Sequence, residues 1–96
     1  EDFKLIPNDG VYFVKSLIDS HYFFGMMNIG FRPTVNGKIR TTEVHFLNFN
    51  ENLYDKKIKI EVLDLIRNEK KFNSLKDLEK QLVSDKKVCE DLIQKL

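Results

Sequence analysis

The sequence predicts a single, mainly β domain: a small antiparallel β-barrel or curled sheet covered by one C-terminal helix. Segments rich in β-branched and aromatic residues, separated by turn residues, fill the first two-thirds of the 96-residue chain. The last quarter instead repeats apolar residues at helical spacing. A chain of this length has room for one core, and its 42% apolar content, which includes eight Phe and three Tyr, is enough to build it.

The first two strands are predicted at residues 10–18 and 21–29. Both segments are dominated by β-branched and aromatic residues. The Asp19-Ser20 pair between them is typical of a turn. Pro33 has no backbone N–H to donate, which argues against a central strand at that position. The Asn36-Gly37 pair favours a tight reversal of the chain.

Two more strands are predicted at residues 40–49 and 57–66. In the first of these, alternation with a period of two puts Glu43 and His45 on the same face. The second begins with alternating apolar residues and then becomes continuously apolar. A β-bulge or bend near Leu63 explains that change of face.

A helix is predicted at about residues 75–95. Ser74 is a candidate N-cap, with Asp77 three residues later in an imperfect capping box. One helical stripe contains the apolar residues, and Asp85 interrupts it. Because Cys89 falls on this stripe, we interpret it as a small core residue and not as a nucleophile. The stripe consists of Leu75, Leu78, Leu82, Cys89, Leu92 and Leu96.

The charge pattern argues against a nucleic-acid partner. Sixteen Lys and Arg against fifteen Asp and Glu leave a formal charge of +1, and the signs are interspersed, whereas DNA-binding domains gather basic residues on one face. The longest uncharged apolar stretch, residues 22–31, is too short to span a bilayer. No secretory leader is recognisable, and the single cysteine cannot form an intrachain disulfide. We therefore expect a cytoplasmic protein without a membrane partner.

Glu43 and His45 are the first candidates for chemistry. A carboxylate on a rigid strand can take a proton from a hydroxyl, and such general-base action is typically worth about 10²–10⁴-fold in rate. The alternative is that both residues lie on a solvated face. The sequence has no GxxxxGK[ST], GxGxxG, GxSxG or HExxH motif, so an enzyme of this sequence would use a site of another kind.

Other candidate ligand contacts each have a simpler structural explanation. Asn28, at the end of a predicted strand, could bind a ligand or close a turn. Phe31, Tyr54 and Phe72 could stack on a flat ligand or belong to the core. The basic cluster that begins at Arg67 and includes Lys70 and Lys71 could contact a phosphate or face solvent.

The order of several short motifs resembles the riboflavin kinase domain that closes bacterial bifunctional FAD synthetases. The resemblance covers nearly the whole chain, in order and with compatible spacing. Each motif is weak by itself, whereas the ordered set is specific. The motifs are DGVY (9–12), NIGFRPT (28–34), TEVHFLNF (42–49), LY (53–54), RNEKKFNSL (67–75) and QLVSD (81–85).

This resemblance implies a Greek-key β-barrel and the conversion of riboflavin and ATP, with Mg²⁺, into FMN and ADP. It implies that Glu43 is the base acting on the ribityl 5′-hydroxyl. On the flavin side it implies Arg67, Phe72 and Asn28. On the nucleotide side it implies Asn48, Leu53 and Tyr54.

The sequence departs from the family pattern in three places. Asn48 stands where Asp is frequent, and Asp55 stands where Gly is usual. The PTAN motif, whose Thr and Asn bind the metal and phosphates in the family, does not occur here, so no metal ligand is assigned. We therefore expect a fragment that lacks the first strand of the domain, is a poor kinase, and pairs with a second copy through the open barrel edge. A flavin- or nucleotide-holding module and a protein-interaction barrel are the alternatives.

Overall fold

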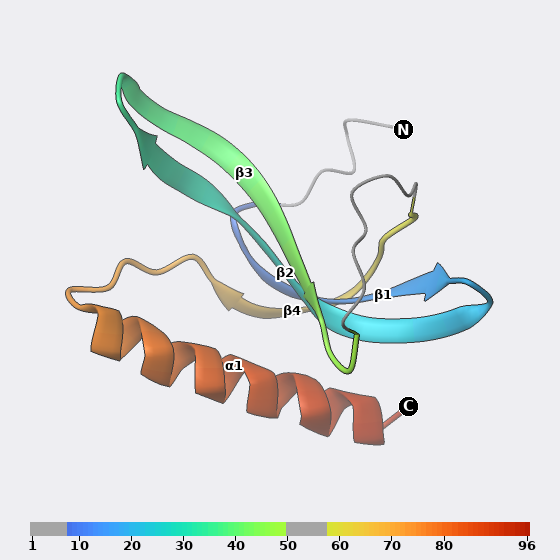
Figure 1. The fold of residues 1–96 in the computed structure, drawn as a ribbon. Helices are drawn as coiled ribbons and strands as arrows, with labels where there is room; N and C mark the ends of the chain where they lie inside the picture. Colours follow the sequence, from blue (N-terminus) through green and yellow to red (C-terminus); the bar gives the residue numbers. More distant parts are fainter. Residues whose placement is uncertain (1–7, 50–57) are drawn as a thin grey trace.

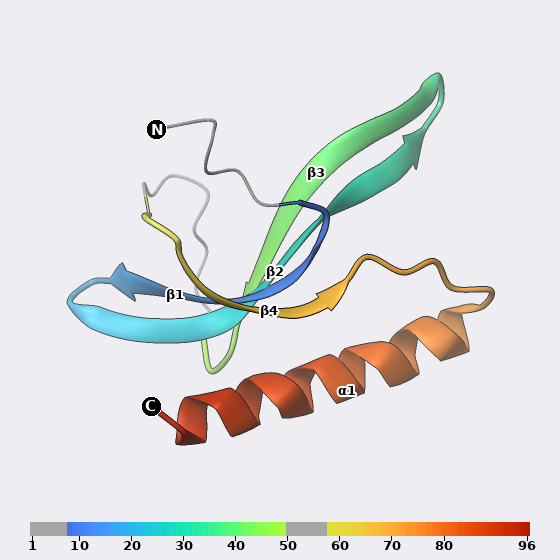
Figure 2. The ribbon, with the colours of Figure 1, turned by 180° about the vertical axis from the view of Figure 1, so that it is seen from behind.

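The computed structural model describes residues 8–49 and 58–96 as an antiparallel sheet with one helix against it (Figure 1). The sheet has four strands in the order β3-β2-β1-β4. Both views show α1 running along one face of the sheet (Figures 1 and 2). The elements are β1 (Gly10–Ile18), β2 (His21–Thr34), β3 (Gly37–Phe46), β4 (Glu61–Asn68) and α1 (Leu75–Gln94).

The mainly β class and the single C-terminal helix are confirmed. The sheet is open, so the described strands do not close into the Greek-key barrel that the resemblance implies. Strands β3 and β4 lie at its two edges. No helix in residues 8–49 and 58–96 is both long and apolar enough to cross a bilayer.

Strand β2 is longer than predicted and continues through Pro33 to Thr34. The expectation that the strand stops at Ile29 was wrong. The pairing of β2 with β1 ends there, with Gly10 opposite Ile29, but its pairing with β3 continues. Beyond that point β2 pairs only with β3, and a proline is tolerated where one side of a strand has no partner. The resulting β2–β3 hairpin extends beyond the rest of the sheet (Figure 1).

Strand β3 lies three residues earlier than predicted at both ends, beginning at Gly37 and finishing at Phe46. The hairpin turn is formed by Val35 and Asn36. Gly37 follows it with a φ of 142°, a conformation that glycine adopts without steric cost. The predicted reversal is therefore confirmed, one residue earlier along the chain.

Strand β4 contains the bulge predicted near Leu63. Val14 pairs with Val62 while Phe13 pairs with Asp64, which leaves Leu63 without a partner on β1. A second bulge, not predicted, lies at Ile66, between the residues that pair with Val11 and Tyr12. Because each bulge inserts one residue, the side chains after it change face. Strand β4 begins at Glu61, four residues later than predicted, and ends at Asn68, two residues later than predicted.

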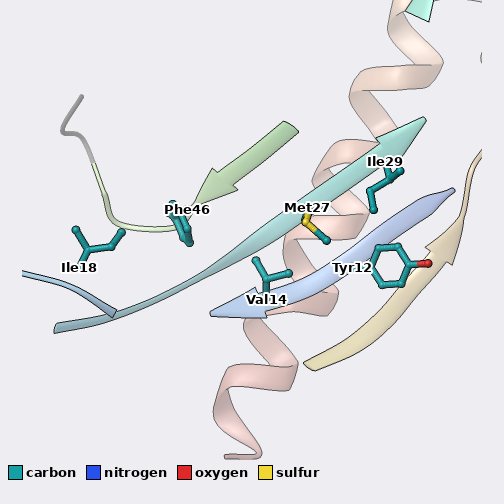
Figure 3. Packing of buried hydrophobic residues seen from close by; sticks show 6 residues of the cluster. All are labelled: Tyr12, Val14, Ile18, Met27, Ile29 and Phe46. Carbon is teal, nitrogen blue, oxygen red and sulfur yellow. The ribbon is translucent and has the colours of Figure 1, made fainter. Parts of the chain in front are cut away.

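Alternation along β1 divides the core into two clusters. Tyr12 and Val14 belong to the first, whereas Phe13 points to the opposite side and belongs to the second. The second cluster lies between the sheet and α1, where Leu47 and Cys89 join Phe13. Figure 3 shows the first cluster, which consists of Tyr12, Val14, Ile18, Met27, Ile29 and Phe46.

The helix begins as the sequence predicts. The Ser74 hydroxyl accepts a hydrogen bond from the backbone N–H of Asp77 at 3.1 Å, which confirms the N-cap. Cys89 is fully buried, which confirms its assignment to the core. Asp85, on the same stripe, is buried as well.

Candidate functional site

Four side chains stand in a row across the sheet, one from each strand. Glu43 on β3 pairs with Asn28 on β2, Asn28 pairs with Val11 on β1, and Val11 pairs with Arg67 on β4. Directly opposed residues in an antiparallel sheet carry their side chains on the same face. The register therefore brings together three of the predicted site residues.

Two cavities lie between this row and α1. One has a volume of about 350 Å³, and its lining includes Arg32, Arg67 and Phe72. The other has a volume of about 190 Å³, and its lining includes Met26, His45 and Asp85. We call the two together the candidate groove, because they share Asn28, Glu43 and Leu82 as lining residues.

Glu43 presents an accessible carboxylate at the rim of the candidate groove. Its side chain is 62% exposed, and its Oε1 lies 3.3 Å from Nη2 of Arg32. Arg32 also reaches Glu69, with Nη1 3.4 Å from Oε2. Arg32 therefore links the candidate base to the segment that follows β4. An ionised carboxylate held in this way can accept a proton from a hydroxyl bound in the groove.

Asn28 carries the polar atom in the groove that most needs a partner. Its Oδ1 is buried, and no donor among the residues that the structure describes reaches it. A buried oxygen without a donor costs free energy, typically about 1–3 kcal/mol. A ligand N–H or O–H entering the groove would remove that cost, so Asn28 fits the binding role predicted for it.

Arg67 forms an ion pair with Asp85 of the helix. Its Nε lies 2.9 Å from Oδ1 of Asp85, and its Nη2 lies 2.9 Å from Oδ2. The guanidinium also stands over the Phe72 ring, 5.7 Å from the centroid, within the range of a cation–π contact. Arg67 and Phe72 therefore form one wall of the groove. In the rest of the basic cluster Lys70 and Lys71 are exposed, and Lys70 donates a hydrogen bond to Gln81 at 3.1 Å.

His45 shares the face of Glu43, as the alternation predicted, and both line the smaller cavity. Asn48 does not line either cavity of the candidate groove. It adopts a left-handed backbone with φ of 58° in the turn after β3, and it lines another hollow, of about 410 Å³, against the C-terminal half of α1. Leu53 and Tyr54, the other nucleotide-side candidates, lie outside the described residues.

Several groove residues were not singled out from the sequence. Glu69 and Leu82 needed the fold, because β4 and α1 bring them to Arg32 and Glu43 on β2 and β3 from distant positions in the sequence. Asp85 carried a signal, since an acidic residue on an apolar stripe requires a buried partner. Among the described residues no three or more His, Cys, Asp or Glu side chains are placed to hold a metal ion.

Comparison with known proteins gives consistent matches over most of the chain. Residues 1–93 match the family model described as riboflavin kinase. A bifunctional riboflavin kinase/FMN adenylyltransferase of Haemophilus influenzae is 42% identical over 80 residues, covering 82% of this chain and 26% of that protein. The protein of the same description from Bacillus subtilis is 39% identical over 85 residues, covering 85% and 27%.

Two further relatives carry other descriptions. The RNA-binding riboflavin kinase RibR of Bacillus subtilis is 37% identical over 78 residues, covering 80% of this chain and 34% of that protein. A crystal structure described as a macrolide-efflux protein from Streptococcus pneumoniae is 33% identical with a TM-score of 0.76, covering 88% of this chain and 28% of that one. The chain thus spans about a quarter to a third of the length of these relatives.

Proposed function

This chain belongs to the riboflavin kinase family, and we propose that it is the kinase part of a bifunctional riboflavin kinase/FMN adenylyltransferase. The proposed reaction moves the γ-phosphoryl group of ATP to the 5′-hydroxyl of riboflavin and yields FMN and ADP. The chain matches only about a quarter of the length of the bifunctional relatives. The adenylyltransferase activity of the whole protein is therefore part of the proposal.

The observation that carries the proposal is the pairing of Glu43 with Asn28 at the groove. An accessible carboxylate stands directly across from a buried amide oxygen that has no donor among the described residues. Glu43 would take the proton of the ribityl hydroxyl while the hydroxyl oxygen attacks the γ-phosphorus of ATP. In phosphoryl transfer the protein contributes mostly positioning and charge, with one group orienting the nucleophile.

The remaining predicted contacts divide into two sides. On the flavin side, Asn28 Oδ1 would accept a hydrogen bond from a riboflavin N–H or O–H, and Phe72 with Arg67 would form the wall beside it. On the nucleotide side we retain Asn48, together with Leu53 and Tyr54. The Asn48 hollow shares His45 with the candidate groove, which is what supports placing ATP on that side.

Magnesium is proposed to accompany ATP, but no residue is assigned to it. The described residues contain no group of three or more His, Cys, Asp or Glu side chains that could hold the ion. We further propose a cytoplasmic location, small molecules as the substrates, no nucleic-acid or membrane partner, and a homodimer formed through an open sheet edge.

The test is FMN formation from riboflavin and magnesium-ATP, measured by chromatography for the natural chain and for Glu43→Gln. We expect the substitution to lower the rate by about 10²–10⁴-fold, as loss of a general base does. The matched control is Glu61→Gln, which removes another exposed carboxylate on β4 outside the groove and should leave the rate unchanged.

Riboflavin binding, followed by quenching of flavin fluorescence, separates the possible results. Binding with turnover that survives Glu43→Gln would show that another group is the base. Binding without turnover would restrict the described groove to holding the flavin. If the natural chain neither binds riboflavin nor forms FMN, the proposed function is wrong.

A further inference from the structure

Asp85 is the most deeply buried charged side chain at the groove. Its side chain is 2% exposed, and that of its partner Arg67 is 13% exposed. Arg67 Nε donates to both carboxylate oxygens, at 2.9 and 3.1 Å, and Nη2 donates to Oδ2 at 2.9 Å. This fork-on-fork arrangement is the strongest geometry available to an ion pair.

The pair is the centre of a longer chain of contacts. Gln81, one helical turn before Asp85, donates to Asp85 Oδ1 at 2.9 Å, and it accepts a hydrogen bond from Lys70 at 3.1 Å. Lys70 and Arg67 both stand over the Phe72 ring, at 5.9 and 5.7 Å. Helix α1 is therefore tied through Arg67 to residues 69–73, which connect β4 to the helix.

Stability alone does not require such a pair. Removing two charges from water is costly, and a well-packed apolar pair of similar volume often stabilises a fold as well or better. An ion pair, however, fixes orientation because its hydrogen bonds have defined directions. The ion pair fixes the guanidinium of Arg67, which stands over the Phe72 ring. Phe72 lines the groove together with Asn28 and Glu43.

We propose that Asp85 is a positioning residue, which holds Arg67 so that Phe72 and residues 69–73 stay in place as the flavin-side wall of the groove. This inference rests on the proposed function for the identity of the ligand, riboflavin. The positioning itself is a property of the free protein and can be measured without any ligand. Asp85 contacts no reacting group in this scheme, because its oxygens are occupied by Arg67 and Gln81.

The decisive variant replaces the whole pair, because Asp85→Ala alone would strand a buried guanidinium and risk unfolding the protein. The double substitution Arg67→Met with Asp85→Leu keeps similar volumes and should keep the natural unfolding midpoint in urea. The control is Cys89→Ala, which lies one turn further along the same buried stripe. It loosens the packing of the helix but leaves the Arg67 contacts intact.

Backbone ¹⁵N relaxation provides the ligand-free measurement. In the double variant we expect lower order parameters in residues 69–73 with unchanged values in β1 and β2. In Cys89→Ala we expect the order parameters of residues 69–73 to stay as in the natural protein. Unchanged order parameters of this segment in a folded double variant would overturn the proposal, whether or not the protein is a kinase.

Riboflavin kinetics provide the functional measurement. A misplaced wall should weaken flavin binding, so we expect the KM for riboflavin to rise by about tenfold to about a hundredfold in the double variant. The kcat at saturating riboflavin should change much less, because the ion pair of Glu43 is with Arg32 and not with Arg67. Equal losses in the double variant and in Cys89→Ala would show a purely structural role. An absence of riboflavin binding in the natural protein would contradict the proposed function and leave the order parameters to decide the positioning.

Discussion

Asp85 and Cys89 lie on the same buried stripe of α1, but only Asp85 has an oppositely charged partner. Asp85 keeps its charge partner, Arg67, inside the protein. Cys89 has a weak hydrogen bond to the Gly25 carbonyl, with Sγ 3.7 Å from the oxygen. Burial, with a smaller contribution from the neighbouring Glu90 carboxylate, raises the pKa of the Cys89 thiol to about 11.

The raised pKa predicts a stability loss at alkaline pH. An unfolded cysteine ionises near its ordinary pKa of 9.0, whereas the folded thiol holds its proton until about 11. Between these values the folded state binds more protons, so the free energy of unfolding falls as pH rises, by roughly 2–3 kcal/mol from this group. Below pH 9 the contribution is constant.

Urea unfolding at pH 8 and at pH 11 would measure this effect. Tyr and Lys also titrate in that window, so the comparison is with Cys89→Ala, which should lose less stability over the same interval. An equal loss in both proteins would contradict the assignment. At neutral pH, a thiol reagent should modify the folded natural protein far more slowly than the urea-unfolded chain.

At the scale of the elements, the alternation of apolar and polar residues was enough to predict the faces of the strands. It placed Glu43 with His45 correctly and located the bulge at Leu63. It could not place Asn28 opposite Glu43, because register is set by pairing between strands and not within one strand. The second bulge, at Ile66, shifts Arg67 into the same row, and nothing in the apolar pattern marks it. The pairing of Arg67 with Asp85 depends on that shift and could not be predicted from the apolar pattern.

Strand β2 depends on Gly25 for its close approach to β3. A Cβ at this position would collide with the backbone carbonyl oxygen of His45 and would lie 2.8 Å from Cα of Phe46. Both are backbone atoms that cannot turn aside. Gly25→Ala should therefore push β2 and β3 apart, with a cost of about 1–3 kcal/mol.

Thermal unfolding of Gly25→Ala against Val35→Ala would test this prediction. Val35, at the hairpin turn, is fully exposed, so its truncation should leave the melting temperature unchanged. A natural melting temperature for Gly25→Ala would show that the sheet can relax around a methyl group at this position.

At the scale of the whole molecule, the open sheet has two edges. Strand β4 has β1 as its only described neighbour, and Val62, Leu63 and Leu65 on it are exposed. An unpaired strand with exposed apolar side chains is a template for pairing with another chain. Strand β3 exposes two such residues, Ile39 and Val44, against these three on β4, and we therefore propose the homodimer at β4.

Light scattering over a range of protein concentrations measures this association. We expect the mass to rise toward that of a dimer, and we expect Val62→Lys to shift the rise to higher concentration, because lysine at an edge opposes strand pairing. The matched control, Ile39→Lys, introduces the same charge on β3 and should not shift it. A monomer at millimolar concentration would contradict the dimer.

The β2–β3 hairpin, which extends past the end of β1, also provides a site for attaching a label. Its turn at Val35 and Asn36 is exposed and lies outside both core clusters. The natural sequence has one cysteine, and that thiol is buried. A Val35→Cys substitution would therefore give a single reactive thiol for a fluorescent or spin label. Such a label would report the tumbling and orientation of the sheet without disturbing the groove.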